Sequence, residues 1–214
     1  KNKKIKALVT AGPTNEYIDP VRFISNKSSG KQGYELANSL HKRGFETTLI
    51  SGPSKLSINE NINLIKVETA EEMFRATQES LPTDIAIFSA AVADFRIDKK
   101  EQKKIKKKEK FLINLEKNID ILNYVSKHNS MRPKLVIGFA AETDDLNNNA
   151  IAKLKTKNCD WIIANDVSRK NIGFDSDFNE VTIFYKNKKR EKLFMKNKSL
   201  ISEEIVERIN NQIN

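Results

Sequence analysis

The chain has 214 residues, with 38 Lys or Arg against 28 Asp or Glu and a formal net charge of +10. A typical domain has ~150 residues, so this length predicts one generous domain or one domain with a small accessory unit. No apolar run approaches the ~18 residues of a membrane-spanning helix, and we therefore expect no membrane association. A single cysteine, Cys159, excludes an internal disulfide and favours a reducing, cytoplasmic setting, while His41 and His128 lie too far apart for the usual zinc motifs.

Apolar strands alternate with helical patterns along most of the chain. Strands are predicted at residues 5–10, 47–50, 62–67, 84–89, 135–139 and 161–164. Helical patterns fill residues 30–43, 70–81, 118–125 and 144–154. Strands that are nearly all apolar are typical of parallel sheets covered on both faces. The alternation therefore predicts an α/β fold, with a Rossmann-like, doubly wound, mainly parallel sheet.

Two segments interrupt this alternation. A lysine-rich stretch at about residues 96–112 predicts a basic insertion, and residues 111–115 are predicted to form a strand-like piece at its end. Near the carboxyl end, two apolar runs flank a polar turn and predict an antiparallel hairpin at about residues 180–196. An amphipathic helix is expected from Ser199 onward. We thus predict a single domain over residues 1–214 that carries a basic insertion and an added hairpin.

The positive charge raises the question of nucleic-acid binding. It is concentrated in two runs, residues 99–110 and 186–192, and neither run contains an aromatic residue. Polynucleotide grooves usually interleave cations with aromatic platforms on which bases stack. We therefore expect no nucleic-acid partner and interpret the second run as a solvated loop.

Glycines point to an anion-binding crevice. Five of the seven glycines fall at predicted strand ends or helix starts, namely Gly12, Gly30, Gly33, Gly52 and Gly138. Backbone amides exposed at such positions bind phosphates, although tight turns alone also use glycine. The first strand is not followed by G-x-G-x-x-G, and no P-loop glycine precedes Gly30-Lys31. Ordinary NAD enzymes and P-loop kinases are therefore disfavoured.

The segment from Asp19 to Gly30 is too long and polar for an ordinary strand-to-helix connection. Ser28 or Ser29 could cap the following helix while its free amides face a phosphate. Asn26 could hold a carboxylate or a developing acyl oxygen, but asparagine is also common in turns. The residues alone leave both interpretations of Asn26 open.

Seven motifs occur in the order found in one known family. They are Thr10–Thr14, Asp19–Gly30, Ser51–Pro53, Ala90–Asp94, Lys104–Lys107, Gly138–Thr143 and Ala164–Val167. Almost end to end, the chain resembles the phosphopantothenoylcysteine synthetases of coenzyme A biosynthesis. That family joins L-cysteine to 4'-phosphopantothenate with a nucleoside triphosphate, CTP in most bacterial members. The resemblance implies a ligase that forms an acyl-nucleotidyl intermediate, with release of pyrophosphate and then of the nucleoside monophosphate.

The resemblance also implies roles for individual residues. Asn26 would contact the acyl group, and Arg22 would support its loop. The lysine-rich stretch at about residues 96–112 would be a closing flap, from which Lys104 would reach the triphosphate. Nucleotide contacts are implied for Gly12, Ser28, Ser29, Gly30, Gly52, Ala90, Ala91, Asp94, Lys104, Asn118, Ile119, Asp120, Ile121, Phe139, Lys153 and Lys157. No side-chain metal site is expected with certainty, because Mg²⁺ would be held by the phosphates, with Asp94 as a candidate ligand. Without the resemblance, Phe139 would be ordinary core, and Lys153 with Lys157 a solvated helix face.

One departure concerns Lys117–Ile121, where Ile119 replaces the proline of the family motif. We predict Asn118 as the helix cap and Ile119 as the first helical position, which proline would preorganise. The family is dimeric, and the predicted hairpin is a candidate interface because its apolar face needs cover. In bacteria the synthetase is often fused to a flavin-dependent phosphopantothenoylcysteine decarboxylase, so that enzyme is an expected partner, but no FMN is expected on this chain.

A rival interpretation is a non-catalytic, Rossmann-like nucleotide-binding module. Such a module would bind nucleotide through the same loops and form no product. The choice between CTP and ATP also stays open, because base selection in such sites depends mostly on backbone groups.

Overall fold

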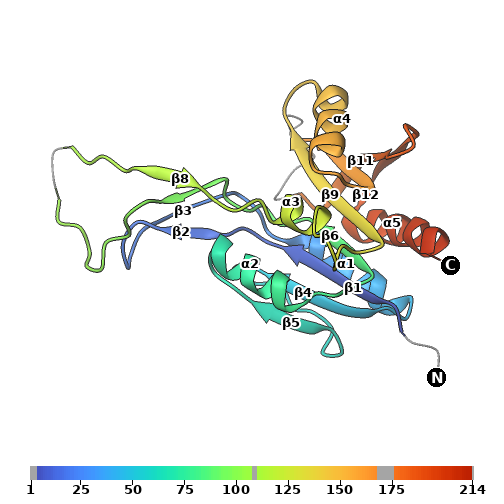
Figure 1. Ribbon diagram of the computed structural model, residues 1–214, viewed down its shortest axis with the longest axis horizontal. Helices are drawn as coiled ribbons and strands as arrows, with labels where there is room; N and C mark the ends of the chain where they lie inside the picture. The colour runs from blue at the N-terminus through green and yellow to red at the C-terminus, as the bar shows by residue number, and fades with distance from the viewer. Residues whose placement is uncertain (1–3, 108–109, 168–175, 214) are drawn as a thin grey trace.

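An eight-stranded sheet forms the central layer of the computed structural model, which describes residues 4–107, 110–167 and 176–213 (Figure 1). In spatial order its strands are β12 (Arg190–Asn197), β11 (Phe178–Tyr185), β10 (Trp161–Asp166), β9 (Leu135–Glu142), β6 (Ile85–Phe88), β1 (Lys6–Ala11), β4 (Glu46–Ser51) and β5 (Asn63–Lys66). Neighbouring strands from β10 to β5 are parallel, whereas β11 and β12 run antiparallel. The predicted Rossmann-like, mainly parallel sheet is confirmed.

Helices cover both faces of the sheet. On one face, α1 (Lys31–Lys42) and α5 (Lys198–Ile213) bury residues such as Leu36 and Ile205 against the strands. On the other lie α2 (Ala70–Glu79), α3 (Ile121–Ser126) and α4 (Leu146–Thr156). Val9 belongs to the first core and its neighbour Leu8 to the second, because successive side chains of a strand point to opposite faces. Burial on both faces explains why these strands are apolar throughout.

The carboxyl-terminal hairpin matches its predicted position, but the argument for an interface on it is wrong. Val181, Ile183 and Leu193 of β11 and β12 lie in the same buried core as Ile201 and Ile205 of α5. The chain's own last helix therefore covers the apolar face that we expected to need a second copy. Phe194, on the opposite side of β12, is 67% exposed but stands apart from this core.

Two short antiparallel hairpins form a separate arm. β2 (Asn15–Tyr17) pairs with β3 (Phe23–Ser25), and β7 (Phe95–Ile97) pairs with β8 (Leu115–Lys117). β2 also lies beside β7, and Figure 1 shows the arm projecting away from the main sheet. The predicted strand at residues 111–115 is wrong, since only Leu115 is in β8. We call residues 98–114, which close the β7–β8 hairpin, the flap.

The strand order reverses between β1 and β6. From β1 the chain proceeds to β4 and β5 on one side, then returns to β6 on the other. In open α/β sheets the loops leaving such a pair of strands part from each other and leave a crevice for ligands. Here the two loops are tied near their base, because the Ala91 amide donates to the Gly12 carbonyl at 2.9 Å.

Three glycines bring the start of α1 against these strand ends. Gly12 and Gly30 adopt φ of 78° and 79°, a left-handed conformation that favours glycine. A Cβ on Gly30 would lie 3.2 Å from the Cα of Gly12, and a Cβ on Gly12 would lie 3.3 Å from the Gly52 oxygen. Gly138 differs from its prediction: it lies inside β9, packed against Ile162 and Leu122, rather than at a strand end.

Candidate functional site

A first cleft of about 280 Å³ opens at the start of α1. Its walls come from the loops after β3 and β6, from the first turn of α1, from β9, β10 and β11, and from α4 and the start of α5. It is lined by Asn26, Ser28, Ser29, Gly30, Lys31, Gln32, Gly33, Ser89, Ala90, Ala91, Val92, Phe139, Ala141, Lys153, Asn165, Asn179 and Lys198. These described residues include three lysines and no carboxylate, so the first cleft favours an anionic ligand.

A second cleft of about 500 Å³ lies between the loop after β6 and α3. Its lining is Thr10, Phe88, Ala90, Val92, Ala93, Asp94, Phe95, Lys117, Asn118, Ile119, Asp120, Ile121, Leu122, Phe139, Lys153 and Lys157. Four residues, Ala90, Val92, Phe139 and Lys153, line both clefts. The two clefts therefore adjoin at a shared wall, where groups of two different ligands could meet.

Asn26 is held at this wall by the loop after β6. Its Nδ2 lies 3.2 Å from the carbonyl oxygens of both Ala91 and Val92. An amide nitrogen has two N–H groups to donate, so these two carbonyls occupy both. Binding an acyl oxygen through this nitrogen therefore requires the release of one carbonyl.

The start of α1 differs in detail from its predicted cap. The N-cap is Gly30, and no side chain caps the helix. The Ser28 and Ser29 hydroxyls instead accept hydrogen bonds from the amides of Gly30 and Lys31, at 3.2 and 3.3 Å. First-turn amides of a helix lack intrahelical partners and carry the positive end of its dipole. This end of α1 adds to the positive potential of the first cleft.

The far wall of the first cleft was missed at the level of sequence. Gln32 donates from Nε2 to the Ser202 hydroxyl at 2.7 Å and accepts from Asn179 Nδ2 at 2.9 Å. Lys198, the first residue of α5, is only 4% exposed. These residues meet because α5 packs beside α1 although the two helices lie far apart in the chain. In the sequence, the only indication of this wall was Asn165, which belongs to the motif Ala164–Val167 but was assigned no role.

The cap of α3 is Asp120 rather than the predicted Asn118. Asp120 Oδ1 accepts from the Asn123 amide at 2.8 Å, as an N-cap does. Asn118 Nδ2 donates to Glu16 Oε1 and to the Ala93 carbonyl, each at 2.8 Å. Ile119 consequently precedes the cap and is not the first helical residue, so the reason given for a proline there does not hold.

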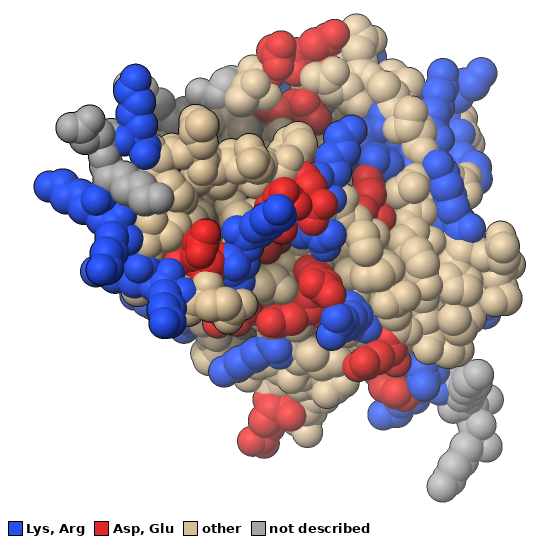
Figure 2. All heavy atoms as spheres, turned by 60° about the vertical axis from the view of Figure 1, so that its left-hand side comes forward, with Lys and Arg blue, Asp and Glu red and all other residues tan. Residues whose placement is uncertain are grey.

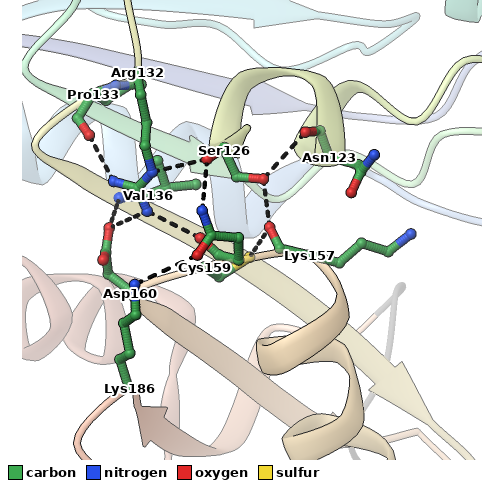
Figure 3. A network of polar contacts seen from close by, with 10 residues as sticks. Asn123, Ser126, Arg132, Pro133, Val136, Lys157, Cys159, Asp160 and Lys186 are labelled. Atoms are coloured by element: carbon green, nitrogen blue, oxygen red, sulfur yellow. Dashed lines mark hydrogen bonds and ion pairs between the residues drawn. The ribbon is translucent and has the colours of Figure 1, made fainter. Parts of the chain in front are cut away.

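Lys153 and Lys157 are brought together beside the second cleft. The Lys153 ammonium donates to the Phe139 carbonyl at 3.1 Å, and that of Lys157 forms an ion pair with Asp120. A polar network fixes the backbone at Lys157, as Figure 3 shows. The Ser126 hydroxyl donates to the Lys157 carbonyl, while Arg132 bonds to the Ser126 carbonyl at 2.8 Å.

Asp160 completes this network. Arg132 also donates to the Asn158 carbonyl at 2.9 Å and to the Asp160 carboxylate at 3.1 Å, and Asp160 accepts from the Val136 amide (Figure 3). The end of α4 is thereby tied to the start of β9. Lys157 thus projects from a fixed helix end rather than from a frayed one.

Four predicted site residues line neither cleft. Gly12 and Gly52 lie behind Gly30 as backbone supports. Lys104 is exposed on the flap. Arg22 binds the carboxylate of Asp19, with Nη2–Oδ2 at 2.6 Å and Nε–Oδ2 at 3.0 Å. Their catalytic or nucleotide contacts stay predictions.

Lysines dominate the flap. The described part contains seven lysines against two acidic residues. In the view of Figure 2, lysine and arginine side chains gather at one margin of the molecule. The seven lysines are Lys99, Lys100, Lys103, Lys104, Lys106, Lys107 and Lys110. Such a segment attracts polyanions over a distance of about 10 Å at moderate salt.

The family resemblance implies a bound Mg²⁺, for which carboxylates near the clefts are candidate ligands. Among the described residues, no three His, Cys, Asp or Glu side chains gather to form a metal-binding group. Asp94 and Asp120 both line the second cleft. Mg²⁺ is usually held by one or two carboxylates together with substrate phosphates. Asp120 is already paired with Lys157, so the Asp94 carboxylate is the one that fits such an ion. In the described ranges, no helix combines the length and apolarity that crossing a membrane would require.

Comparison with known proteins identifies the family. A family model described as "DNA/pantothenate metabolism flavoprotein C-terminal domain" matches residues 2–213. The chain belongs to this family. It is 44% identical over 203 residues to the coenzyme A biosynthesis bifunctional protein CoaBC of Haemophilus influenzae, covering 94% of this chain and 50% of that protein. The Bacillus subtilis protein of the same name is 40% identical over 205 residues. The chain thus spans about half the length of these relatives.

Solved structures of the family share the fold. The crystal structure of the C-terminal domain of a CoaBC protein superposes with a TM-score of 0.82 at 35% identity, covering 98% of this chain and 95% of that one. A Cab2 mutant in complex with phosphopantothenate-cysteine superposes with a TM-score of 0.73 at 17% identity, covering 97% of this chain and 87% of that one. At that identity the second likeness concerns the fold alone.

Proposed function

We propose that this chain is a phosphopantothenate–cysteine ligase, which joins L-cysteine to 4'-phosphopantothenate through an acyl-nucleotidyl intermediate. The observation that carries the proposal is the pair of adjoining clefts with one shared wall, because the reaction must bring a carboxylate against the α-phosphorus of a nucleotide. Membership of the family, with relatives named for coenzyme A biosynthesis, supports it.

The chemistry of each cleft favours one substrate. The first cleft, with its lysines and the start of α1, suits phosphopantothenate, whose phosphate and carboxylate groups are both anionic. The second offers the apolar Ile119, Ile121 and Phe139 to a base, and Lys153 and Lys157 to phosphates. Ser28, Ser29 and Gly30 then lie on the acyl-substrate side, although the family resemblance assigned them to the nucleotide. Lys153 lines both clefts, at the junction where the bond between the carboxylate and the α-phosphorus would form.

The proposed reaction has two steps. The carboxylate of phosphopantothenate attacks the α-phosphorus and pyrophosphate leaves, while Lys153 and the cations of the flap neutralise the charge that develops. The cysteine amine then attacks the activated carbonyl and expels the nucleoside monophosphate. Asn26 would donate to the acyl oxygen as negative charge grows on it, after releasing Ala91 or Val92. Bound Mg²⁺ would neutralise the triphosphate, with Asp94 within the same cleft as its protein ligand.

Incubation of the purified chain with phosphopantothenate, cysteine, Mg²⁺ and either CTP or ATP tests this function. We expect phosphopantothenoylcysteine, pyrophosphate and CMP, with CTP preferred over ATP. Asn26→Ala should lower the rate by about 10²-fold or more, as for loss of one oxyanion donor. Asn63→Ala, at an exposed position of the edge strand β5, is the matched control and should keep full activity. Nucleotide binding without any product would favour the rival, a non-catalytic module.

We further propose that two copies associate through the arm. Among the residues that the structure describes, eight of the fifteen exposed large apolar side chains lie on it, and a water-exposed cluster of this kind marks an interaction site. They are Val21, Phe23, Ile24, Phe95, Phe111, Leu112, Ile113 and Leu115. The flavin-dependent decarboxylase remains a proposed partner, because the relatives are bifunctional and this chain spans half of their length.

A further inference from the structure

Asp19 is a buried carboxylate whose bonding capacity is fully used. Its side chain is 0% exposed and accepts hydrogen bonds from the amides of Val21 and Arg22 at 2.8 and 2.9 Å. Arg22 adds two more through its guanidinium. The fifth comes from the amide of Ile105, 3.1 Å from Oδ2 and 86 residues away in the chain. The Arg22 guanidinium holds the pKa of this carboxyl well below its usual range, so it stays ionised at neutral pH.

Both backbone groups of Ile105 are held by this ion pair. Its N–H donates to Asp19, and its carbonyl accepts from Arg22 Nη2 at 2.9 Å. A second backbone contact lies four residues earlier, where the Glu101 amide donates to the Ile18 carbonyl at 3.0 Å. The turn between β2 and β3 therefore fastens the flap at two points, and the fastening at residue 105 depends on side chains.

The fixed position of Ile105 matters because of the adjacent residue, Lys104. Lys104 precedes Ile105 directly, so a fixed Ile105 also limits the positions open to the Lys104 backbone. The flap is rich in like charges, which repel one another and favour an open, disordered segment. The Asp19–Arg22 pair adds no net charge, and its hydrogen bonds hold Ile105 without involving a ligand. Ordering in advance lowers the entropy lost when a cation closes on a ligand.

We propose that Asp19 is a positioning residue, which fixes the flap through the backbone of Ile105 and so places Lys104 for the nucleotide step. The placement of Lys104 rests on the proposed function, whereas the fastening of the flap does not. A competing account is that Asp19 and Arg22 only stabilise the turn between β2 and β3. The two accounts differ in what happens when the flap is released and the turn is left intact.

Two variants separate these accounts. Asp19→Asn keeps the shape of the side chain, but it removes the charge and replaces one of the two accepting oxygens with an amide nitrogen that cannot accept. Ile105→Pro deletes the flap's own N–H donor and leaves the Asp19–Arg22 pair and its turn in place. Lys107→Pro, two residues further along the same flap, is the matched control because no described hydrogen bond uses its amide. If Asp19→Asn fails to fold, Ile105→Pro alone decides.

Limited trypsin digestion of the full chain tests the fastening without any substrate. Lys99, Lys100 and Lys103 are retained in all three variants, and the exposed turn at residues 186–189 serves as an internal reference. We expect Asp19→Asn and Ile105→Pro to raise cleavage at these three lysines roughly tenfold relative to the reference turn, because a released segment samples open states more often. Lys107→Pro should leave the ratio near that of the parent. An unchanged ratio in Ile105→Pro would overturn the fastening.

Steady-state kinetics test the placement of Lys104. In Ile105→Pro we expect KM for the nucleotide to rise roughly tenfold, with KM for cysteine changed by less than about twofold. Equal changes in both constants, or none, would overturn the positioning role even if digestion showed a released flap. If the parent chain forms no product at all, the proposed function fails, while the digestion result still stands on its own.

Discussion

Cys159 lies at the foot of β10 and is 1% exposed. Burial, followed by the negative charge of Asp160, raises the pKa of its thiol from 9.0 to about 12. The folded state therefore favours the neutral thiol, whereas the unfolded chain ionises near pH 9. The contribution to stability is complete below pH 9 and is lost as the pH rises toward 12.

The free energy of unfolding should consequently fall as the pH is raised from 8 to 10.5. Cys159→Ala should show a shallower fall, which urea titrations at each pH would measure. Some decline should persist, because burial also raises the pKa of Tyr185 to about 12. Equal slopes for the two proteins would show that Cys159 is not the responsible group.

The ion pair between Lys157 and Asp120 leads to a second prediction at the residue scale. Lys157→Gln should weaken nucleotide binding about tenfold, because one charge-assisted contact to a phosphate is lost. Asp120→Asn should keep the α3 cap, since asparagine caps helices as well as aspartate does, and should not weaken binding, because it frees Lys157. Calorimetry with the Mg²⁺–nucleotide complex measures both. Unaltered affinity in Lys157→Gln would remove that lysine from the site.

Sequence reasoning located some residues of the site and not others, for physical reasons. The Ser28–Gly30 turn was found because it precedes a helix start, which is a local signal, whereas the residues alone left Asn26 open and only the family resemblance assigned it to the site. Asn118 was mistaken for the cap because asparagine and aspartate cap equally well, and only the three-dimensional contacts distinguish Asn118 from Asp120. The far wall of the first cleft joins distant segments, so no local pattern marks it.

At the scale of elements, α1 approaches β1 more closely than any residue with a side chain would allow. A Cβ on Gly33 would lie 2.4 Å from the Cβ of Ala11 and 2.6 Å from the Ser89 hydroxyl. Gly33→Ala should therefore push the helix outward and lower the free energy of unfolding by about 1–3 kcal/mol, as overpacking does. Chemical denaturation checks this, with Glu35→Ala on the same helix as the control. A Gly33→Ala protein as stable as the parent would contradict the packing described.

The main elements were predictable and the arm was not. Apolar runs such as residues 84–89 and 161–164 predict buried strands, because a strand covered on both faces of the sheet is apolar throughout. β2 and β8 have three residues each, Asn15–Tyr17 and Leu115–Lys117, and are largely polar. Strands of that length have no periodicity to read, and they form because two hairpins lie side by side.

At the scale of the whole molecule, the arm should govern assembly. Replacing Leu112, which is 91% exposed, with glutamate should convert a dimer to a monomer, because it buries an unpaired charge in the apolar contact. Phe194→Glu on β12 should leave the dimer intact. Sedimentation velocity distinguishes these states. A dimer that survives Leu112→Glu and dissociates with Phe194→Glu would place the interface on the β11–β12 hairpin instead.

The two clefts draw on different stretches of the chain. No described residue beyond Lys157 lines the second cleft, whereas the first needs Asn165, Asn179 and Lys198. During synthesis, the wall against α5 therefore emerges from the ribosome after all the described lining of the second cleft. A growing polypeptide therefore acquires the surface proposed for the nucleotide before it can enclose the proposed acyl substrate, so the proposed acyl activation requires that α5 has docked.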